Sequence, residues 1–261
     1  MLGCFRDKTG LEKIICGHTC TTNWSKSRMN AQLQLKTHGI AVDKILEAEI
    51  WDPAPGRPWF MDQHFKTLVN GPGYASGRVY ALFLDQKLVY IGSFGTSRKH
   101  NLYSGNVVAT RVWTHIGSMT LRGRKLHIAP KTLDTLKKRF GDHPAITEIA
   151  KKKPFDDKGN LTTPNRISVA LDHWDAFCPP NRLPLDRFDF SYIQVSSTMG
   201  DHLPDCVIKK AIKEAEKISI RDLQPRANDE VEPSSAQSPS FEEVESKLRE
   251  NLEGQIAKAI S

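Results

Sequence analysis

Cysteines are few in this chain, and long apolar runs are missing from it. Five of the 261 residues are cysteines, an odd number that cannot complete a disulfide framework. No stretch is apolar and long enough to span a bilayer, and no segment resembles a secretory signal. These features argue against a disulfide-built secreted scaffold and against an integral membrane protein. They predict a reduced, cytoplasmic protein that has no membrane partner.

One group of cysteines lies near the N-terminus. Cys16 and Cys20 flank His18, and Cys4 lies upstream. Structural zinc sites need a complete set of four ligands at characteristic spacings, and this spacing fits no standard finger. We therefore expect partly buried thiols here rather than a metal site.

Acidic residues are scarce over most of the chain. The net charge is +7, but residues 1–228 carry +12 and residues 229–261 carry −5. Residues 98–153 hold thirteen Lys or Arg and three acids, a surplus of +10. Such a surplus is expected where a protein neutralises phosphates, although a solvated basic face has the same composition. Charge alone leaves both interpretations open.

Two apolar runs predict an antiparallel hairpin. Residues 78–84 and 88–92 are rich in Val, Leu, Tyr, Phe and Ile, and a short polar turn at residues 85–87 joins them. Side chains alternate across a strand, so Tyr80 and Tyr90 each share a face with apolar neighbours. The sequence therefore places two phenols on adjacent strands.

A helix is predicted directly after the hairpin, over residues 106–117. Arg111 and His115 are four residues apart, which puts both on one helical face, and valines and an isoleucine form the apolar stripe. A second helix is predicted over residues 203–223. Glu216 lies near its apolar stripe, where an acid is costly unless it is paired or bound to a metal. A solvent-facing acid is the alternative interpretation, and Glu214 is the rival candidate if the register differs.

These pieces together resemble the GIY-YIG nuclease superfamily. Val79-Tyr80-Ala81 stands in place of the first tripeptide, and Tyr90-Ile91-Gly92 matches the second. Glu216, followed by apolar positions, a proline and Asn228, is similar to the family's closing helix. The resemblance covers residues 78–115 and 188–228, 79 of the 261 residues. Two departures are that only the tyrosine of the first tripeptide is kept, and that Ser93 stands where some members have a lysine.

The resemblance implies a role for each of these residues. Glu216 would be the sole protein ligand of a Mg²⁺ ion, Arg111 would bind the scissile phosphate, and Asn228 would close the site. Tyr80 would take the proton of the attacking water, while Tyr90 would contact the phosphate or orient the base. His115 would accept from or orient a tyrosine, and could stand in for the missing lysine.

Expected recognition elements lie between the first helix and a third strand at residues 188–196. Residues 118–187 form a basic insertion, and the loop before the first helix is cationic. Reading base edges requires elements that reach a groove, so we expect DNA contacts in both places. The candidates are Arg98, Lys99, Arg122, Arg124, Lys125, Lys137, Lys138, Arg139 and Asn165.

The predicted fold class is α+β, with a small three-stranded antiparallel sheet flanked by helices. Residues 1–76 form a mostly helical extension, with helices within residues 28–50, broken at Gly39, and at residues 60–68. Residues 77–228 form the core with its insertion. In the insertion, helices are expected at residues 130–140 and 144–152, and short strands at residues 126–129 and 167–171.

A linker at residues 229–239 separates the core from an amphipathic helix at residues 240–261. The apolar stripe of this helix predicts either docking on the body of its own chain or pairing with another subunit. Pairing would make a dimer or tetramer, which suits an enzyme that cuts both strands of a symmetric site.

The resemblance implies a type II restriction endonuclease that hydrolyses double-stranded DNA at a specific, palindromic sequence with Mg²⁺. The four-residue spacing of Arg111 and His115 resembles restriction members of the superfamily. A structure-selective repair nuclease or a homing endonuclease is the alternative enzyme. A catalytically inactive DNA-binding protein is the alternative without activity.

Overall fold

The structure is a computed structural model that describes residues 35–50, 63–68, 77–94, 107–122, 126–127, 130–147, 160–177, 181–195, 205–228 and 238–260. Internal contacts divide the chain into two units, Met1–Gln32 and Leu33–Ser261, and every described residue belongs to the second. Among the described residues, no helix is long and apolar enough to cross a membrane.

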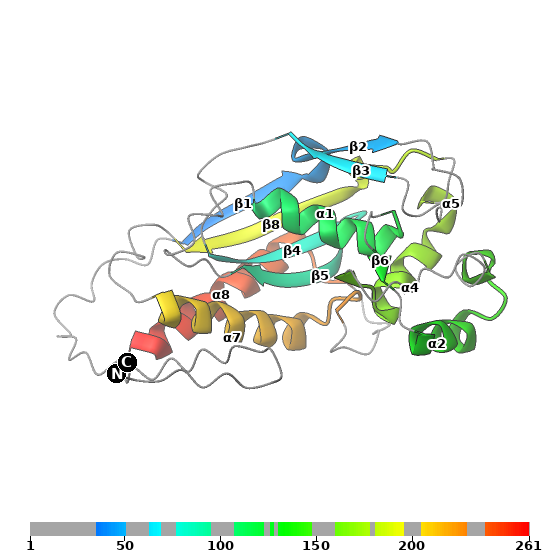
Figure 1. Cartoon of the computed structure of the whole chain (residues 1–261). Coiled ribbons are helices and arrows are strands. Elements are labelled where there is room, and N and C mark those ends of the chain that lie inside the picture. Colours follow the sequence, from blue (N-terminus) through cyan, green and yellow to red (C-terminus); the bar gives the residue numbers. More distant parts are fainter. Residues whose placement is uncertain are drawn as a thin grey trace, which may run out of the picture. The chain divides into compact units, whose positions relative to one another are not determined.

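Among the described residues, strands come first along the chain, short strands and helices are mixed in the middle, and two long helices come last (Figure 1). The strands are β1 (Leu35–Ala41), β2 (Leu46–Ile50), β3 (Gln63–Thr67), β4 (Arg78–Leu84), β5 (Lys87–Phe94), β6 (Leu126–His127), β7 (Asn160–Leu161) and β8 (Phe188–Val195). The α-helices are α1 (Val107–Thr120), α2 (Pro130–Phe140), α4 (Pro164–Asp172), α5 (Trp174–Phe177), α7 (Asp205–Leu223) and α8 (Phe241–Ile260). Two 3-10 turns, η2 (Val42–Lys44) and η6 (Leu185–Arg187), precede β2 and β8. Residues 144–147 are helical as well.

The central sheet is antiparallel and has four strands in the order β1-β8-β4-β5. The hairpin of β4 and β5 confirms the sequence prediction. Its turn residues Asp85 and Gln86 have φ of 50° and 63°, the left-handed conformation that two-residue hairpin loops require. The predicted strand at residues 188–196 is also confirmed, because β8 pairs with β4.

The fourth strand corrects a sequence prediction. The prediction of two helices within residues 28–50 is wrong, because β1 and β2 lie there and β1 pairs with β8. The prediction of a helix at residues 60–68 is wrong as well, because β3 lies there and pairs with β2. Gly39 marks a close approach rather than a helix break, since a Cβ there would lie 2.9 Å from the Cζ atom of Phe241. The prediction of a strand at residues 167–171 is also wrong. That apolar run is buried inside α4, and a short apolar run does not distinguish a buried helix from a strand.

The helices cover the two faces of the sheet. On one face α7 and α8 pack side by side against the strands (Figure 1). The apolar stripe of α8 is buried there within its own chain, with Val244, Leu248, Leu252 and Ile256 at most 1% exposed. The other face holds Tyr80, Tyr90 and Phe190, packed against Val112 and Ile116 of α1. The fold is therefore mixed α+β, and homo-oligomerisation stays a prediction.

Candidate functional site

Three predicted site residues meet on the α1 face of the sheet. Tyr80 comes from β4, Tyr90 from β5 and His115 from α1. The Oη atom of Tyr80 lies 2.7 Å from Nε2 of His115, in hydrogen-bonding range. The ring centroids of Tyr90 and His115 are 4.1 Å apart, and those of the two tyrosines 6.3 Å apart. Residues 35 positions apart in the sequence thus form one aromatic cluster around a hydrogen bond.

Gly92 gives the Tyr80 ring its space. Gly92 lies opposite Tyr80 in the hairpin register. A Cβ at this position would lie 2.6 Å from the Cζ and Oη atoms of Tyr80 and 2.8 Å from Cε1 of Tyr90. No side chain fits within that distance. Gly92, at the end of the second tripeptide, must therefore be glycine for the Tyr80 phenol of the first tripeptide to keep its position.

Burial sets the protonation of the Tyr80 and His115 pair. Burial, and then the neighbouring Tyr90 phenol, raise the pKa of Tyr80 well above 10.0. Burial, and then the guanidinium groups of Arg166 and Arg111, lower the pKa of His115 well below 6.5. At neutral pH both groups are therefore uncharged, and the imidazole tautomer sets the direction of their hydrogen bond: with the ring proton on Nδ1, the Tyr80 hydroxyl donates to Nε2 of His115. The Nδ1 atom is buried without a hydrogen-bond partner among the described residues.

Two guanidinium groups flank this pair. Arg111 is exposed one turn before His115 on α1, and its Cζ atom lies 5.7 Å from the centroid of the Phe94 ring. Arg166 comes from α4, and its Cζ atom lies 5.2 Å from the centroid of the Tyr90 ring. Sequence reasoning missed Arg166 because it follows Pro164 in a segment that was expected to lead into a strand. The proline at the first helical turn was the signal that could have identified it.

Glu216 lies on α7 with its side chain 13% exposed. Its Oε2 atom accepts hydrogen bonds from Ser93 Oγ at 2.7 Å and from Lys213 Nζ at 2.6 Å. After burial, Tyr90 and Arg111, its negative charge is a smaller influence that raises the pKa of Tyr80. The rival Glu214 is 41% exposed and pairs with Lys217. The register of α7 therefore favours Glu216 as the site residue.

The carboxylate of Glu216 is compatible with a water-rich metal ion. The Oε1 atom takes part in neither of the two hydrogen bonds, and Ser93 adds a hydroxyl oxygen beside it. Mg²⁺ commonly keeps several waters and uses one or two carboxylates. Within the described ranges, no group of three or more His, Cys, Asp and Glu side chains gathers as a denser metal site. Ser93 was noted in the sequence only as a departure from the family pattern, and its contact with Glu216 was not foreseen.

Asn228 is hydrogen-bonded to the backbone at the outer edge of β5. Its side chain accepts a hydrogen bond from the Ile91 backbone N–H at 2.9 Å and donates to the Ile91 carbonyl at 2.8 Å. The amide thus pairs with the edge of β5 between Tyr90 and Gly92, as a neighbouring strand would. The backbone carbonyl of Asn228 in turn accepts a hydrogen bond from Asn165 Nδ2 at 2.8 Å. Asn165, predicted as a DNA contact, is used inside the fold.

The predicted DNA-contact residues have different environments. Arg122 is 1% exposed and its guanidinium lies 3.5 Å from the Phe177 carbonyl, so the prediction that it contacts DNA is wrong for this structure. Lys137, Lys138 and Arg139 are exposed in the last turn of α2, where a cation also complements the helix dipole. The other candidates lie outside the described residues, as does the cysteine group near the N-terminus: Arg98, Lys99, Arg124, Lys125, Cys16, His18 and Cys20.

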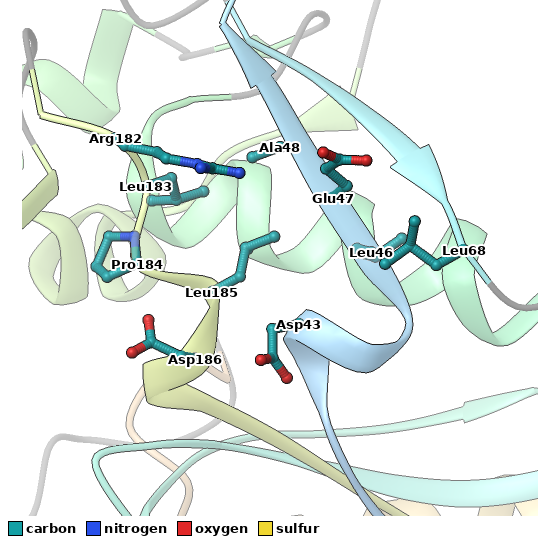
Figure 2. A pocket seen from close by; sticks show the side chains of 10 residues that line it. All are labelled: Asp43, Leu46, Glu47, Ala48, Leu68, Arg182, Leu183, Pro184, Leu185 and Asp186. Atoms are coloured by element: carbon teal, nitrogen blue, oxygen red, sulfur yellow. The ribbon is translucent and has the colours of Figure 1, made fainter.

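A hollow of about 580 Å³ lies away from this site, between β2 and the segment that leads into η6. Figure 2 shows Arg182 extended over it, with Glu47, Asp43 and Asp186 around its rim. Three carboxylates against one guanidinium make this hollow unsuited to a phosphate group. The aromatic cluster with its two arginines is therefore the better candidate for phosphate chemistry.

Comparisons with known proteins found no matching family model, no matching curated protein and no matching solved structure.

Proposed function

We propose that the chain is a Mg²⁺-dependent endonuclease of the GIY-YIG type that hydrolyses phosphodiester bonds of double-stranded DNA. The observation that carries the proposal is the hydrogen bond between Tyr80 and His115, with Arg111 beside it. Phosphodiester hydrolysis needs an acceptor for the water's proton and cationic groups for the phosphate. Both requirements have a candidate in this cluster.

The proton path follows from the protonation of the pair. Tyr80 is a phenol at neutral pH, so it cannot act as a resting base. It takes a proton from the attacking water while its own proton moves to Nε2 of His115, which is neutral and accepts it in the tautomer with the ring proton on Nδ1. The water oxygen bonds to phosphorus, the bond to the leaving oxygen breaks, and His115 holds the proton. Tyr80 is 2% exposed, so the water arrives from the side of Tyr90 and Arg111, which are more exposed.

Arg111 would hold the scissile phosphate, since a planar guanidinium can donate two parallel hydrogen bonds to its oxygens. A Mg²⁺ ion at Glu216 would stabilise the charge that develops on the phosphate and on the leaving oxygen. Ser93 and Lys213 keep that carboxylate oriented toward β5. The spacing of Arg111 and His115 on α1 and the exposed cations of α2 support the narrower proposal, a type II restriction enzyme that cuts at a specific sequence.

The test is digestion of plasmid, phage and branched DNA with and without Mg²⁺. We expect discrete, Mg²⁺-dependent fragments from linear duplexes, with defined ends. Preference for branched DNA would instead indicate a repair nuclease. Salt-sensitive binding without cleavage of any substrate would contradict the enzyme proposal and favour an inactive DNA-binding protein.

A matched pair of variants tests the metal role. Glu216→Ala should lower the cleavage rate by at least about a hundredfold, because it removes a group that stabilises the transition state, while specific DNA binding is retained. Glu214→Ala removes an equal charge two residues away, from a carboxylate that pairs with Lys217. It should cleave at the rate of the unchanged protein. Equal cleavage by both variants would reject Glu216 as the metal ligand.

A further inference from the structure

Arg166 is placed at the site by elements outside the part of the chain that carries the family resemblance. It lies in the first turn of α4, within the basic insertion. The neighbouring Asn165 is hydrogen-bonded to the Asn228 carbonyl, and Ile167 on its other side is fully buried. The two flanking residues thus fix the backbone of Arg166, and α4 packs against α1, which carries His115.

The guanidinium of Arg166 has few partners of its own. Its Nε atom is buried and has no hydrogen-bond partner among the described residues. In the part of the chain that the structure describes, no acid forms an ion pair with it. The Tyr90 ring lies beside it, with the ring centroid 5.2 Å from Cζ. The side chain as a whole is partly exposed, so a positive charge that no described acid neutralises favours an anion that reaches its accessible atoms.

The charges around the cluster are unbalanced. Arg111 and Arg166 both act on the Tyr80 and His115 pair, which is uncharged. Glu216, the acid whose charge influences the pKa of Tyr80, already accepts hydrogen bonds from Lys213 and Ser93. Two guanidinium groups around a neutral pair form an anion site, and arginine suits phosphate oxygens because its donors lie in one plane.

We infer that Arg166, beside the Tyr90 ring, binds the scissile phosphate together with Arg111, beside the Phe94 ring. The inference rests on the proposed nuclease function, which supplies the phosphodiester. Arg166 would then be a catalytic residue that the insertion contributes. The insertion would take part in the chemistry as well as in DNA contact.

The experiment compares three variants in single-turnover cleavage of a DNA that the unchanged protein cuts. Arg166→Ala should lose about a hundredfold in rate at saturating DNA, while DNA binding measured by gel shift changes by only a few fold. Arg166→Lys, which keeps the charge but not the planar donors, should be intermediate. Arg221→Ala is the control, since Arg221 is exposed on α7 and pairs with the adjacent Asp222. It should cleave like the unchanged protein.

Chemical rescue separates a direct contact from a structural role. Guanidinium ion at millimolar concentration should restore part of the cleavage by Arg166→Ala and have no such effect on Arg221→Ala. Full activity of Arg166→Ala, or a loss that guanidinium does not restore, overturns the inference and leaves the nuclease proposal intact. If Arg166→Ala does not fold, Arg166→Lys decides instead. Cleavage by Arg166→Lys at the rate of the unchanged protein would then overturn the inference about Arg166. Absence of cleavage by the unchanged protein overturns both proposals.

Discussion

One methyl group added at Gly92 should disconnect Tyr80 from His115. In Gly92→Ala the new Cβ would lie 2.6 Å from the Cζ and Oη atoms of Tyr80. Carbon contacts normally lie at about 3.5 to 4.0 Å, so the ring must retreat by roughly 1 Å. Phe190, with its ring centroid 5.5 Å from that of Tyr80, limits the retreat on another side. The 2.7 Å contact between Tyr80 and His115 cannot survive a shift of that size as a short hydrogen bond.

Two measurements follow from this displacement. Overpacking of this kind costs about 1 to 3 kcal/mol, so the urea midpoint of Gly92→Ala should fall without a change of slope. Cleavage should fall by about a hundredfold or more, the usual contribution of general-base catalysis. Gly254→Ala is the matched control. Within the described structure no atom lies within 4 Å of its new Cβ on α8, and alanine in a helix should stabilise it by about 0.5 to 1 kcal/mol.

The reasoning fails if Gly92→Ala cleaves DNA at the rate of Gly254→Ala. It fails equally if a crystal structure of Gly92→Ala keeps the hydroxyl of Tyr80 at hydrogen-bonding distance from His115. A variant that is destabilised but fully active would show that this hydrogen bond is not part of the catalytic path. Measuring both stability and rate therefore distinguishes a packing effect from a chemical one.

Four further predictions concern the same framework. The cleavage rate should decline on acidification through a pKa below 6.5, because protonated His115 cannot accept the proton of Tyr80. His115→Gln should lose most of the cleavage rate, and the rate that is left should no longer depend on pH in this range. As the pH falls below 6.5, His115 takes up a proton in the unfolded chain at a higher pH than in the folded chain. The free energy of unfolding should therefore decrease as the pH is lowered, which urea unfolding at a series of pH values would measure. Asn228→Ala leaves the buried N–H and carbonyl of Ile91 without their partner and should cost about 2 to 4 kcal/mol in urea unfolding. Phe241→Ala removes the ring that lies 4.9 Å from that of Phe83 and should lower the free energy of unfolding by about 2 kcal/mol, with cleavage unchanged if α8 only supports the sheet.

Local patterns predicted the hairpin and the long helices because each of these elements shows its own periodicity. In β4 and β5 the apolar runs meet at a two-residue turn, and α8 shows its stripe at every third or fourth residue. Periodicity placed Tyr80 and Tyr90 on adjacent strands and His115 on the next helix, and the family resemblance implied that the three act in one site.

Long-range pairings were beyond local patterns. The β1 segment contains Lys36, Thr37, His38 and Gly39, and its strand conformation depends on pairing with β8, more than 140 residues later. Gly39 was interpreted as a helix break, whereas the Phe241 ring fills the space that a side chain at this position would need. That ring lies about 200 residues later in the sequence, so no local pattern reveals the contact. The contact of Ser93 with Glu216 likewise joins residues 123 positions apart, so no spacing rule reveals it.

Asn228 connects the two halves of the candidate site. Its side chain holds the backbone of Ile91, next to Tyr90, while its carbonyl holds Asn165, next to Arg166. Asn228 therefore links β5 to α4 by hydrogen bonds, beside the contact of Arg166 with the Tyr90 ring. The spacing between the Tyr90 ring and the Arg166 guanidinium depends on Asn228, although Asn228 itself need not touch a substrate. This linkage gives a physical reason for an asparagine at the end of the closing segment, since a side-chain amide carries its acceptor and its donor on two neighbouring atoms and can bind the N–H and the carbonyl of Ile91 together.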